Sequence, residues 1–276
     1  MLRSMYSGIS GLRNFQTKLD VIGNNIANVN TYGFKKGRTI FKDLISQTVA
    51  GASGATATRG GINPKQVGLG SQISAIDTIH TGGSTQFTGN TLDLAIAGDG
   101  FFQVADSNAA HSAYTNTLYT RAGNFYMDNA GYLVNSDGKF LVGNSTVAPA
   151  GLKPIQIPTT AQSMSIGQDG TVTYVDAAGA LQTAGQLVLA KFPNPGGLQK
   201  NGGNYFQATS NSGVVVTGNA TTNGLGQIES GFLEMSNVDL AEEFTEMIVA
   251  QRGFQANTRI ITTSDEILQE LVNLKR

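Results

Sequence analysis

Residues 18–36, KLDVIGNNIANVNTYGFKK, decide the fold. The apolar side chains of this stretch recur three or four positions apart, as one face of an α-helix requires: Leu19, Ile22, Ile26 and Val29. Four asparagines lie among them, although asparagine is a weak helix former. Asn30 and Gly33 predict the end of the helix, because both residue types suit the left-handed backbone of a C-terminal cap. We expect a helix that carries amide groups close to its apolar face.

The same spacing continues back to the N-terminus. The residues that extend the apolar face are Leu2, Met5, Ile9, Leu12 and Phe15. Gly8, Gly11 and Gly23 each lower helix stability by about 0.8–1 kcal/mol relative to alanine, so a helix over residues 1–30 should be marginal alone. The same glycines allow a neighbouring backbone to approach closely, which predicts a helix that forms on assembly.

A second helix is predicted at the other end of the chain, over residues 236–276. Ser236 or Asn237 can cap it, and the acidic residues Asp239, Glu242 and Glu243 interact favourably with the dipole of its first turns. Its apolar stripe consists of Leu240, Phe244, Met247, Phe254, Ile261 and Leu268. A neighbouring stripe consists of Ile260, Ile267, Leu271 and Leu274.

Residues 91–235 predict an all-β outer domain. Residues 91–105, TLDLAIAGDGFFQVA, alternate on both sides of a turn at residues 98–100 and predict a hairpin. Further turn signals, such as NSDG and GQDG, separate short apolar runs. Residues 31–90 are rich in Gly, Ser and Thr and predict a linking segment with a flexible patch. The predicted fold class is α+β, with a terminal helical core domain over residues 1–30 and 236–276.

Composition excludes several classes of protein. The chain has 276 residues, of which 40% are hydrophobic, so it can bury a core. Only 13% of its residues are charged and its net charge is -1, which gives no support for nucleic-acid binding. It has no cysteine, which removes disulfides and thiolate chemistry. No apolar run is long enough for a membrane helix, and the N-terminus lacks the apolar region of a cleaved signal peptide.

Motifs for catalysis, metals and cofactors are missing from the sequence, so we expect no enzyme and no cofactor. His80 and His111 have no second ligand at metal spacing and are interpreted as solvated loop residues. The aspartates of DNAGYLVNSDG miss the spacing of a calcium loop and fit hairpin turns better. A carboxylate pair such as Asp93 and Asp99 could serve a glycosidase, but any acidic β-protein offers such pairs.

The two predicted helices have more apolar positions than one pair can cover. Burying a large apolar side chain contributes about 1.5–3 kcal/mol, so we expect other copies of the chain to cover the remaining positions. The alternative is that both helices pack on the β-domain of their own chain. A secreted adhesin would share the β-rich middle without needing the paired terminal helices, and an extracellular hydrolase would need a functional carboxylate pair.

The residues above resemble one family. LDVIGNNIANVNTYGFKK and SGFLEMSNVDLAEEFTEMIVAQRGFQANTRIITTSDEILQELVNLKR are similar to the N- and C-terminal signatures of the bacterial flagellar axial proteins, which form the rod and hook. LDLAIAGDGFFQV and YTRAGNFYMDNAGYLVNSDG resemble the β-domain of that family. The resemblance covers most of the chain. It implies a structural subunit that stacks helically into a hollow tube, with the terminal helices inside and the β-domain outside.

Within the family, the hook subunit is our first interpretation and the distal rod subunit the alternative. DVIGNNIAN, SNVDL, MIVAQR and LVNLKR resemble the hook protein more. The chain is short for a hook protein, which favours the rod. The hook interpretation implies a curved tube, a universal joint that transmits motor torque to the filament. The implied partners are further copies of the chain, distal rod subunits, the hook cap, hook–filament junction proteins and the flagellar type III export apparatus. The implied location is the extracellular flagellum.

Particular residues follow from this resemblance and from the helical pattern. The N-terminal part of the assembly core is predicted to consist of Leu12, Leu19, Ile22, Asn24, Asn25, Ile26 and Asn28. Its C-terminal part is predicted to consist of Leu240, Phe244, Met247, Gln251, Phe254, Ile261, Leu268 and Leu271. The asparagines would fix the register between subunits, because a misaligned neighbour leaves buried amides unsatisfied. FKDLI, with Phe41, Leu44 and Ile45, is similar to the element by which early subunits dock at the export gate, although such short matches arise often.

Overall fold

The computed structural model describes residues 2–56, 58–108, 114–145 and 151–274. The chain forms two compact units. The helical unit comprises Met1–Ala27, Gly37–Thr78 and Asp239–Arg276, and the β unit comprises Asn28–Lys36 and Ile79–Val238. These units differ from the domains expected above mainly in residues 31–90, which are divided between them. The domain boundaries drawn from the sequence stay a prediction.

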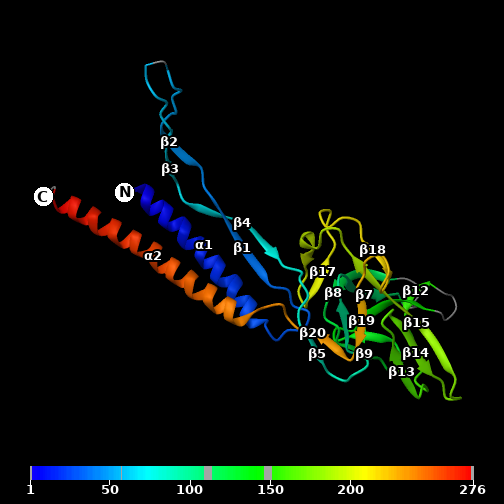
Figure 1. Ribbon diagram of the computed structural model, residues 1–276. Coiled ribbons are helices and arrows are strands. Elements are labelled where there is room, and N and C mark those ends of the chain that lie inside the picture. Colours follow the sequence, from blue (N-terminus) through cyan, green and yellow to red (C-terminus); the bar gives the residue numbers. More distant parts are fainter. Residues whose placement is uncertain (1, 57, 109–113, 146–150, 275–276) are drawn as a thin grey trace. The chain divides into compact units, whose positions relative to one another are not determined.

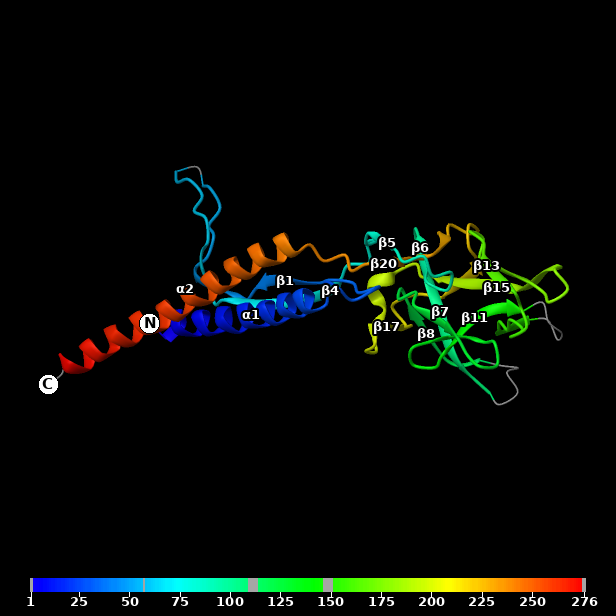
Figure 2. The same cartoon turned by 90° about the horizontal axis from the view of Figure 1, so that it is seen from below.

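Two long helices form the body of the helical unit. α1 is Leu2–Ala27 and α2 is Leu240–Asn273. Figures 1 and 2 show them side by side and antiparallel, with both chain ends at the same end of the pair. With 26 and 34 residues they are about 39 and 51 Å long at 1.5 Å per residue. The predicted helices are therefore present, and Gly33 adopts the expected left-handed conformation beyond α1, with φ of 68°.

The residue that caps α2 is Asp239. Its carboxylate accepts hydrogen bonds from the backbone N–H of Ala241 at 2.8 Å and of Glu242 at 3.3 Å. The prediction of Ser236 or Asn237 as the cap was wrong, because the side chain of Asn237 instead accepts a hydrogen bond from the N–H of Lys36 at 2.8 Å. All three residue types can cap a helix, and only Asp239 directly precedes the first helical residue.

A long antiparallel ribbon completes the helical unit. β1 (Gly37–Asp43) pairs with β4 (Ser71–Thr78), and β2 (Ser46–Ala50) pairs with β3 (Lys65–Gly68). The ribbon therefore occupies much of the segment for which the sequence predicted only a link. Backbone hydrogen bonds hold its two arms together, and they need no apolar alternation to form. In both views, the half formed by β2 and β3 stands away from the helices (Figures 1 and 2).

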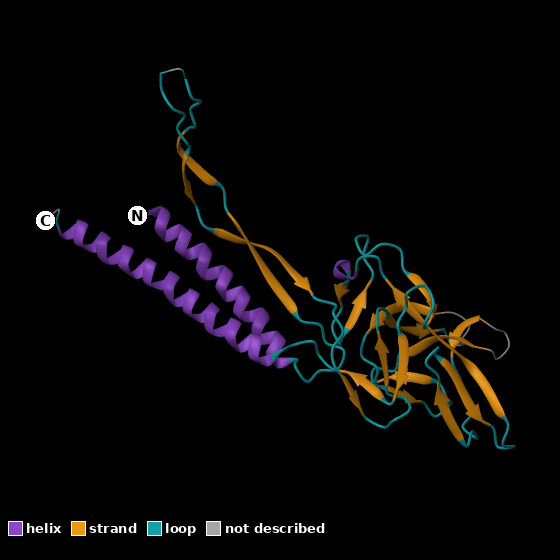
Figure 3. Cartoon of the chain, in the orientation of Figure 1, coloured by secondary structure: helices purple, strands orange, loops and turns teal. Residues whose placement is uncertain are grey.

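The β unit consists almost entirely of antiparallel strands (Figure 3). The strands of its largest sheet are β7 (Phe101–Ser107), β8 (Tyr114–Thr120), β9 (Phe125–Met127), β10 (Leu133–Asn135), β11 (Phe140–Ser145), β12 (Gly151–Pro154), β13 (Ser163–Ile166), β14 (Thr171–Val175), β15 (Leu181–Lys191), β16 (Gln199–Lys200), β17 (Tyr205–Gln207) and β18 (Val216–Asn219). Two smaller pairs are β6 (Leu94–Ala97) with β19 (Gln227–Ser230) and β5 (Thr85–Phe87) with β20 (Phe232–Glu234). A 3-10 turn, η1, covers Pro195–Gly197. The predicted α+β class is confirmed.

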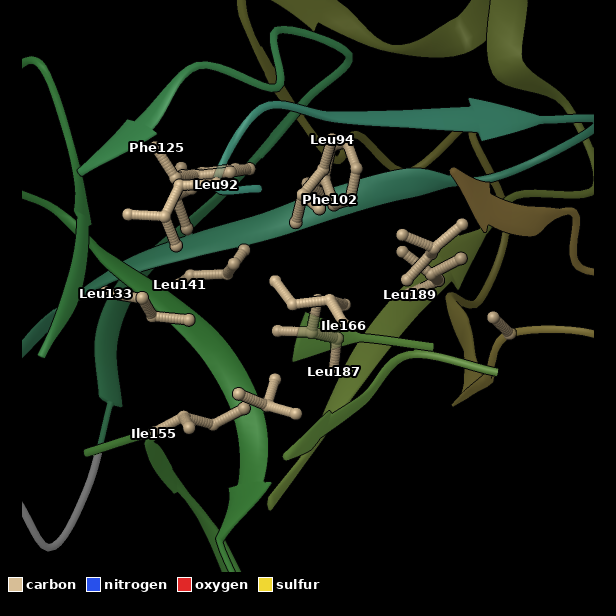
Figure 4. Close-up of a cluster of buried hydrophobic side chains, with 14 of the residues drawn as sticks. Leu92, Leu94, Phe102, Phe125, Leu133, Leu141, Ile155, Ile166, Leu187 and Leu189 are labelled. Atoms are coloured by element: carbon tan, nitrogen blue, oxygen red, sulfur yellow. The ribbon is translucent and has the colours of Figure 1, made fainter. Parts of the chain in front are cut away.

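The described part of the β unit contains two buried apolar clusters. Leu94, Phe102, Phe125, Leu141 and Leu187 are buried in the larger cluster, and Figure 4 shows their side chains directed into the same interior. The rings of Phe102 and Phe125 meet edge to face, with their centroids 5.3 Å apart. These residues come from strands far apart in the sequence, so the core forms only when the whole unit folds.

The hairpin predicted over residues 91–105 was wrong. β6 and β7 lie on either side of the predicted turn, but they do not pair with each other. β6 pairs with β19, whereas β7 pairs with β8, β11 and β15. Gly98 and Gly100 take φ values of 124° and 138°, which redirect the chain between two different sheets. The alternation correctly located the strands but could not identify their partners.

Candidate assembly site

α1 and α2 pack closely because glycines face the partner helix. A Cβ atom added to Gly11 would lie 2.7 Å from Asn257 Oδ1, and one added to Gly253 would lie 2.6 Å from the ring of Phe15. Gly8 is less crowded, since its added Cβ would lie 3.4 Å from Ile261. Of the three glycines that weaken α1, Gly11 therefore makes room for α2, whereas a Cβ added to Gly23 would have no atom within 4 Å. Close approach to a helix of another subunit stays a prediction.

The face of α2 toward α1 has a seven-residue repeat with two positions. One position holds small or polar residues, namely Glu243, Ala250, Asn257 and Ser264. The other holds large apolar residues, namely Met247, Phe254, Ile261 and Leu268. The sequence analysis identified the second set and missed the first, because small and polar residues carry no hydrophobic signal. Because the two sets alternate, the helices can approach closely at the small residues while the large side chains pack along the edge of the interface.

Asn25 ties the end of α1 to the start of α2 and to the ribbon. Its side chain is 1% exposed. The amide Nδ2 donates to the Gly37 carbonyl at 2.9 Å and to Glu243 Oε2 at 3.2 Å, while Oδ1 accepts from the Gly37 N–H at 2.9 Å. Through these hydrogen bonds, Asn25 fixes the register of α1 against α2 and the ribbon within one chain. The role of the asparagines in the register between subunits stays a prediction.

The ribbon covers another side of α1. Asn14 Nδ2 donates to Ser71 Oγ at 2.8 Å, and the rings of Phe15 and Phe41 lie 6.1 Å apart. Close to them, the N–H of Ser71 donates to Ser10 Oγ at 3.4 Å. α1 is therefore held on two sides, by α2 and by the β1–β4 half of the ribbon.

α2 leaves two apolar stripes exposed, one on each flank of the face toward α1. The first stripe consists of Leu240, Phe244 and Ile248, four residues apart, with 40%, 50% and 59% of their surface exposed. The second stripe consists of Val249, Ile260, Ile267 and Leu271, which a period of 3.6 residues places on one line. Contiguous apolar surface of this kind marks a site of protein association.

A second polar feature lies in the β unit. Glu234 is 2% exposed and accepts from Lys35 Nζ at 2.5 Å and from an Arg121 guanidinium nitrogen at 3.2 Å. Gly83 donates its backbone N–H to the same carboxylate at 3.0 Å, and Lys35 also donates to the Thr81 carbonyl at 2.8 Å. Burial lowers the pKa of Lys35, while Glu234 opposes that shift. The cluster joins the segment after α1 to the one before α2. Sequence reasoning missed it, although Glu234 is a lone charge among the apolar residues Phe232, Leu233 and Met235.

The described residues contain neither a metal-binding cluster nor a helix that could cross a membrane, and they include one of the two histidines. Within residues 2–56, 58–108, 114–145 and 151–274, no group of three or more His, Asp or Glu side chains is placed to hold a metal ion. In the same ranges, no helix has the length and apolar character needed to cross a membrane. His80 packs edge to face on Phe101 and Phe206, with ring centroids 5.7 and 5.2 Å away, so its interpretation as a solvated loop residue was wrong. His111 lies outside the described residues.

Comparisons with known proteins agree with this architecture. Residues 5–35 match the model described as "Flagella basal body rod protein", and residues 229–274 match "Flagellar basal body rod FlgEFG protein C-terminal". Residues 95–174 match "Flagellar hook protein FlgE/F/G D1 domain". The chain is 59% identical to the flagellar basal-body rod protein FlgG of Bacillus subtilis (strain 168), over all of both chains. The chain belongs to the flagellar FlgE/F/G rod and hook family.

Other members of the FlgE/F/G family are also similar over most or all of both chains. FlgG of Agrobacterium fabrum is 39% identical, with 96% of this chain and 97% of the relative covered. The flagellar hook protein FlgE of Borreliella burgdorferi is 32% identical, with all of both chains covered. The family consists of structural components of the flagellar basal body and hook. The chain is therefore such a component, and nothing supports an enzymatic activity.

The structure distributes the N-terminal residues of the predicted core over several environments. Ile22 and Asn25 are buried, Leu12, Leu19 and Ile26 are half-buried, and Asn24 is exposed. Asn28 lies beyond α1, where its Oδ1 accepts from Thr31 Oγ1 at 3.1 Å. Of these residues, only those on α1 can lie along the helix pair.

The C-terminal residues of the predicted core divide into two groups. Met247, Ile261 and Leu268 are half-buried along the seam with α1. Leu240, Phe244, Gln251, Phe254 and Leu271 are exposed. Phe254, at the seam position, is 37% exposed. The other four are available to a neighbouring FlgE/F/G subunit, and whether they contact one stays a prediction.

The predicted export element lies in the ribbon. Phe41 is half-buried in β1 against Phe15, whereas Ile45 is 83% exposed. The backbone N–H of Leu44, between them, donates to the Gly70 carbonyl at 2.8 Å. An unfolded chain would present all three side chains together, and the folded chain does not. The export role stays a prediction.

Proposed function

We propose that this chain is the distal rod subunit of the flagellar basal body. Chain length supports this choice. The FlgG relatives of Bacillus subtilis and Borreliella burgdorferi align over 277 and 279 positions, close to the 276 residues of this chain. The hook relatives of Borreliella burgdorferi and Treponema pallidum need 448 and 470 positions. Those hook proteins contain long segments that have no counterpart here.

The hook interpretation, which the sequence motifs placed first, is the less well supported. Its motifs lie in or next to the two terminal helices, and the hook relatives are 29–32% identical to this chain over their whole alignments. The FlgG relative of Bacillus subtilis reaches 59%. Terminal motifs common to both kinds of subunit cannot separate them, whereas the length of the central region can.

In the proposed rod, further copies of the chain cover the exposed stripes of α2. Burying the remaining half of each side chain would contribute on the order of 1 kcal/mol per residue. Stripes on two flanks allow each subunit to contact two neighbours through different surfaces, which generates an open helical array instead of a closed dimer. The helical units would line the tube, and the β units would form its wall.

The proposed partners follow from this position. They are further copies of this chain in the rod, hook subunits at the end of the rod, and the flagellar type III export apparatus during delivery. Export would bring the chain, unfolded, beyond the inner membrane. The low intrinsic stability of α1, with its three glycines, is compatible with that route.

Complementation distinguishes rod from hook. The chain would be expressed in a Bacillus subtilis strain that lacks its own FlgG and, separately, in one that lacks its hook protein, with swimming as the readout. We expect rescue of the first strain alone. Rescue of the hook-deficient strain alone would refute the rod assignment and support the hook. An empty vector and the native Bacillus subtilis gene serve as controls.

A further inference from the structure

A cavity of about 170 Å³ lies in the β unit, beside the cluster of buried charges. Its polar side is formed by His80, Arg121, Lys191 and Asp99. Its apolar side is formed mainly by Phe101 and Phe192. A cavity of this size can hold a small organic molecule of a few heavy atoms, and its two sides suit a molecule with one polar and one apolar end.

Two buried nitrogen atoms without hydrogen-bond partners belong to residues that line this cavity. Among the residues that the structure describes, two buried side-chain nitrogens have no hydrogen-bond partner, His80 Nδ1 and Arg121 Nε. Both residues line the cavity. A buried polar atom without a hydrogen-bond partner destabilises the folded state. Two such atoms beside one cavity indicate a missing polar occupant.

The remaining contacts of Arg121 show which donor is free. The residue is 4% exposed. One terminal nitrogen donates to Glu234 at 3.2 Å and to the Ile96 carbonyl at 3.4 Å, and the other donates to the Gly98 carbonyl at 2.8 Å. Of the three guanidinium nitrogens, Nε alone has no hydrogen-bond partner.

The local charge favours an anion. Arg121 and Lys35 share one buried carboxylate, Glu234, so this buried group contains one more cation than anion. At the cavity, Lys191 and Asp99 form an ion pair at 3.1 Å and balance each other. The surplus positive charge thus lies at Arg121, next to the unused Nε–H donor.

We propose that this cavity binds a carboxylate group. Arg121 Nε–H donates to an oxygen of the bound carboxylate, the His80 ring lies beside the site, and Phe101 and Phe192 enclose the apolar part of the molecule. Arginine and carboxylate form strong charge-assisted hydrogen bonds. A free short-chain acid and an acidic side chain of a second subunit present the same group.

Nuclear magnetic resonance of the His80 ring tests the site directly. The chain has two histidines, so a His111→Gln variant leaves His80 as the sole imidazole. Butyrate would be titrated into the unpolymerised full-length protein, with butyramide as the neutral isostere and inorganic phosphate as a second anion. We expect saturable shifts of the His80 resonances with butyrate and none with butyramide. Shifts that are absent, or equal for butyramide, would overturn the proposal. Tighter binding of phosphate would likewise show that the cavity does not select a carboxylate.

Variants test the named contacts. Arg121→Lys keeps a cation opposite Glu234 but removes the Nε–H, and we expect it to weaken butyrate binding at least about tenfold. Lys191→Met removes a cation at the cavity, and Lys139→Met removes one from the Lys139–Asp106 ion pair elsewhere, as the matched control. If Arg121→Lys fails to fold, the comparison of Lys191→Met with Lys139→Met still tests whether butyrate binds in this cavity. Equal butyrate affinity in Lys191→Met and Lys139→Met would then contradict the proposed site.

The same titration in assembled tubes identifies the source of the carboxylate. If tubes bind butyrate as the unpolymerised protein does, the site takes a free acid. If only the unpolymerised protein binds it, a neighbouring subunit fills the cavity with an acidic side chain. Failure of butyrate to bind either form would overturn the site without affecting the rod assignment, which rests on complementation.

Discussion

At the scale of single residues, Glu234 is a buried carboxylate of the β unit that faces two buried cations. Its carboxylate neutralises Lys35 and Arg121, both of which are buried. A buried ion pair adds little net stability, but removing one partner leaves an uncompensated charge. The cluster therefore fixes where the segments that lead to α1 and α2 enter the β unit.

Glu234→Gln should destabilise the β unit by about 3–5 kcal/mol, because two buried cations lose their counter-charge. Chemical denaturation followed by tyrosine fluorescence measures this change. Asp106→Asn is the control, because it breaks the more exposed pair with Lys139 and should cost less than about 1 kcal/mol. Equal losses in the two variants would show that the buried cluster has no special role.

His80 should make the stability of the β unit depend on pH. Burial, and then the charges of Lys35, Arg121 and Lys200, lower its pKa from 6.5 to about 4. The unfolded chain binds the proton near pH 6.5 and the folded chain only near pH 4, so stability is highest above pH 6.5 and falls as the pH drops to 4. Allowing for partial exposure, the loss is about 2 kcal/mol.

Unfolding experiments at pH 7 and pH 4.5 check this dependence. His80→Phe retains an aromatic ring against Phe101 and Phe206 and removes the titrating group. We expect the free energy of unfolding to fall less between these pH values in the variant than in the wild-type chain. An identical fall in both proteins would assign the pH dependence to other groups.

At the scale of elements, the helix pair depends on which glycines face the partner. Gly253→Ala would place a Cβ atom 2.6 Å from the Phe15 ring and should separate α1 from α2. Gly23 has no atom within 4 Å of its added Cβ, so Gly23→Ala should stabilise α1 by about 0.8–1 kcal/mol. Far-ultraviolet circular dichroism during thermal unfolding measures both effects. Opposite signs are expected, and a loss in both variants would contradict the proposed packing.

The hydrogen bonds of Asn25 give a second prediction for the helix pair. Asn25→Leu removes the amide that serves Gly37 and Glu243 and leaves buried polar groups unsatisfied, at a cost of about 1–3 kcal/mol each. We therefore expect reduced helicity in the unassembled chain. Asn24→Leu, at the neighbouring exposed position, should leave helicity unchanged or higher. Circular dichroism at equal protein concentration compares them, and preserved helicity in Asn25→Leu would argue against the tie.

The sequence predicted where helices and strands lie better than it predicted which elements contact each other. Both helices were predictable because a period of 3.6 residues is a local signal, and the same was true of most turns. The hairpin over residues 91–105 failed because β6 pairs with β19, more than a hundred residues away. Asn25 was recognised as unusual, but its partner Glu243 is 218 residues distant. No local pattern specifies a contact of that range.

At the scale of the whole molecule, the chain belongs to a family of flagellar structural subunits, and its helix α2 leaves apolar stripes exposed. The exposed stripes of α2 explain why so much apolar surface remains on the single chain. The length of the chain matches the FlgG relatives and not the longer hook proteins. The helical pattern predicted the exposed apolar stripes. Only comparison with relatives over their whole length showed that the chain has the length of FlgG.

Electron microscopy of the concentrated protein tests the central claim most directly. The wild-type chain would be compared with a variant that carries Ile260→Gln, Ile267→Gln and Leu271→Gln, all at exposed positions of α2. We predict tubes for the wild type and unassembled protein of unchanged helicity for the variant. Arg252→Gln, also exposed on α2, is the control for a polar change and should still give tubes. Tubes of the same geometry from the triple variant would contradict assembly through the α2 stripes.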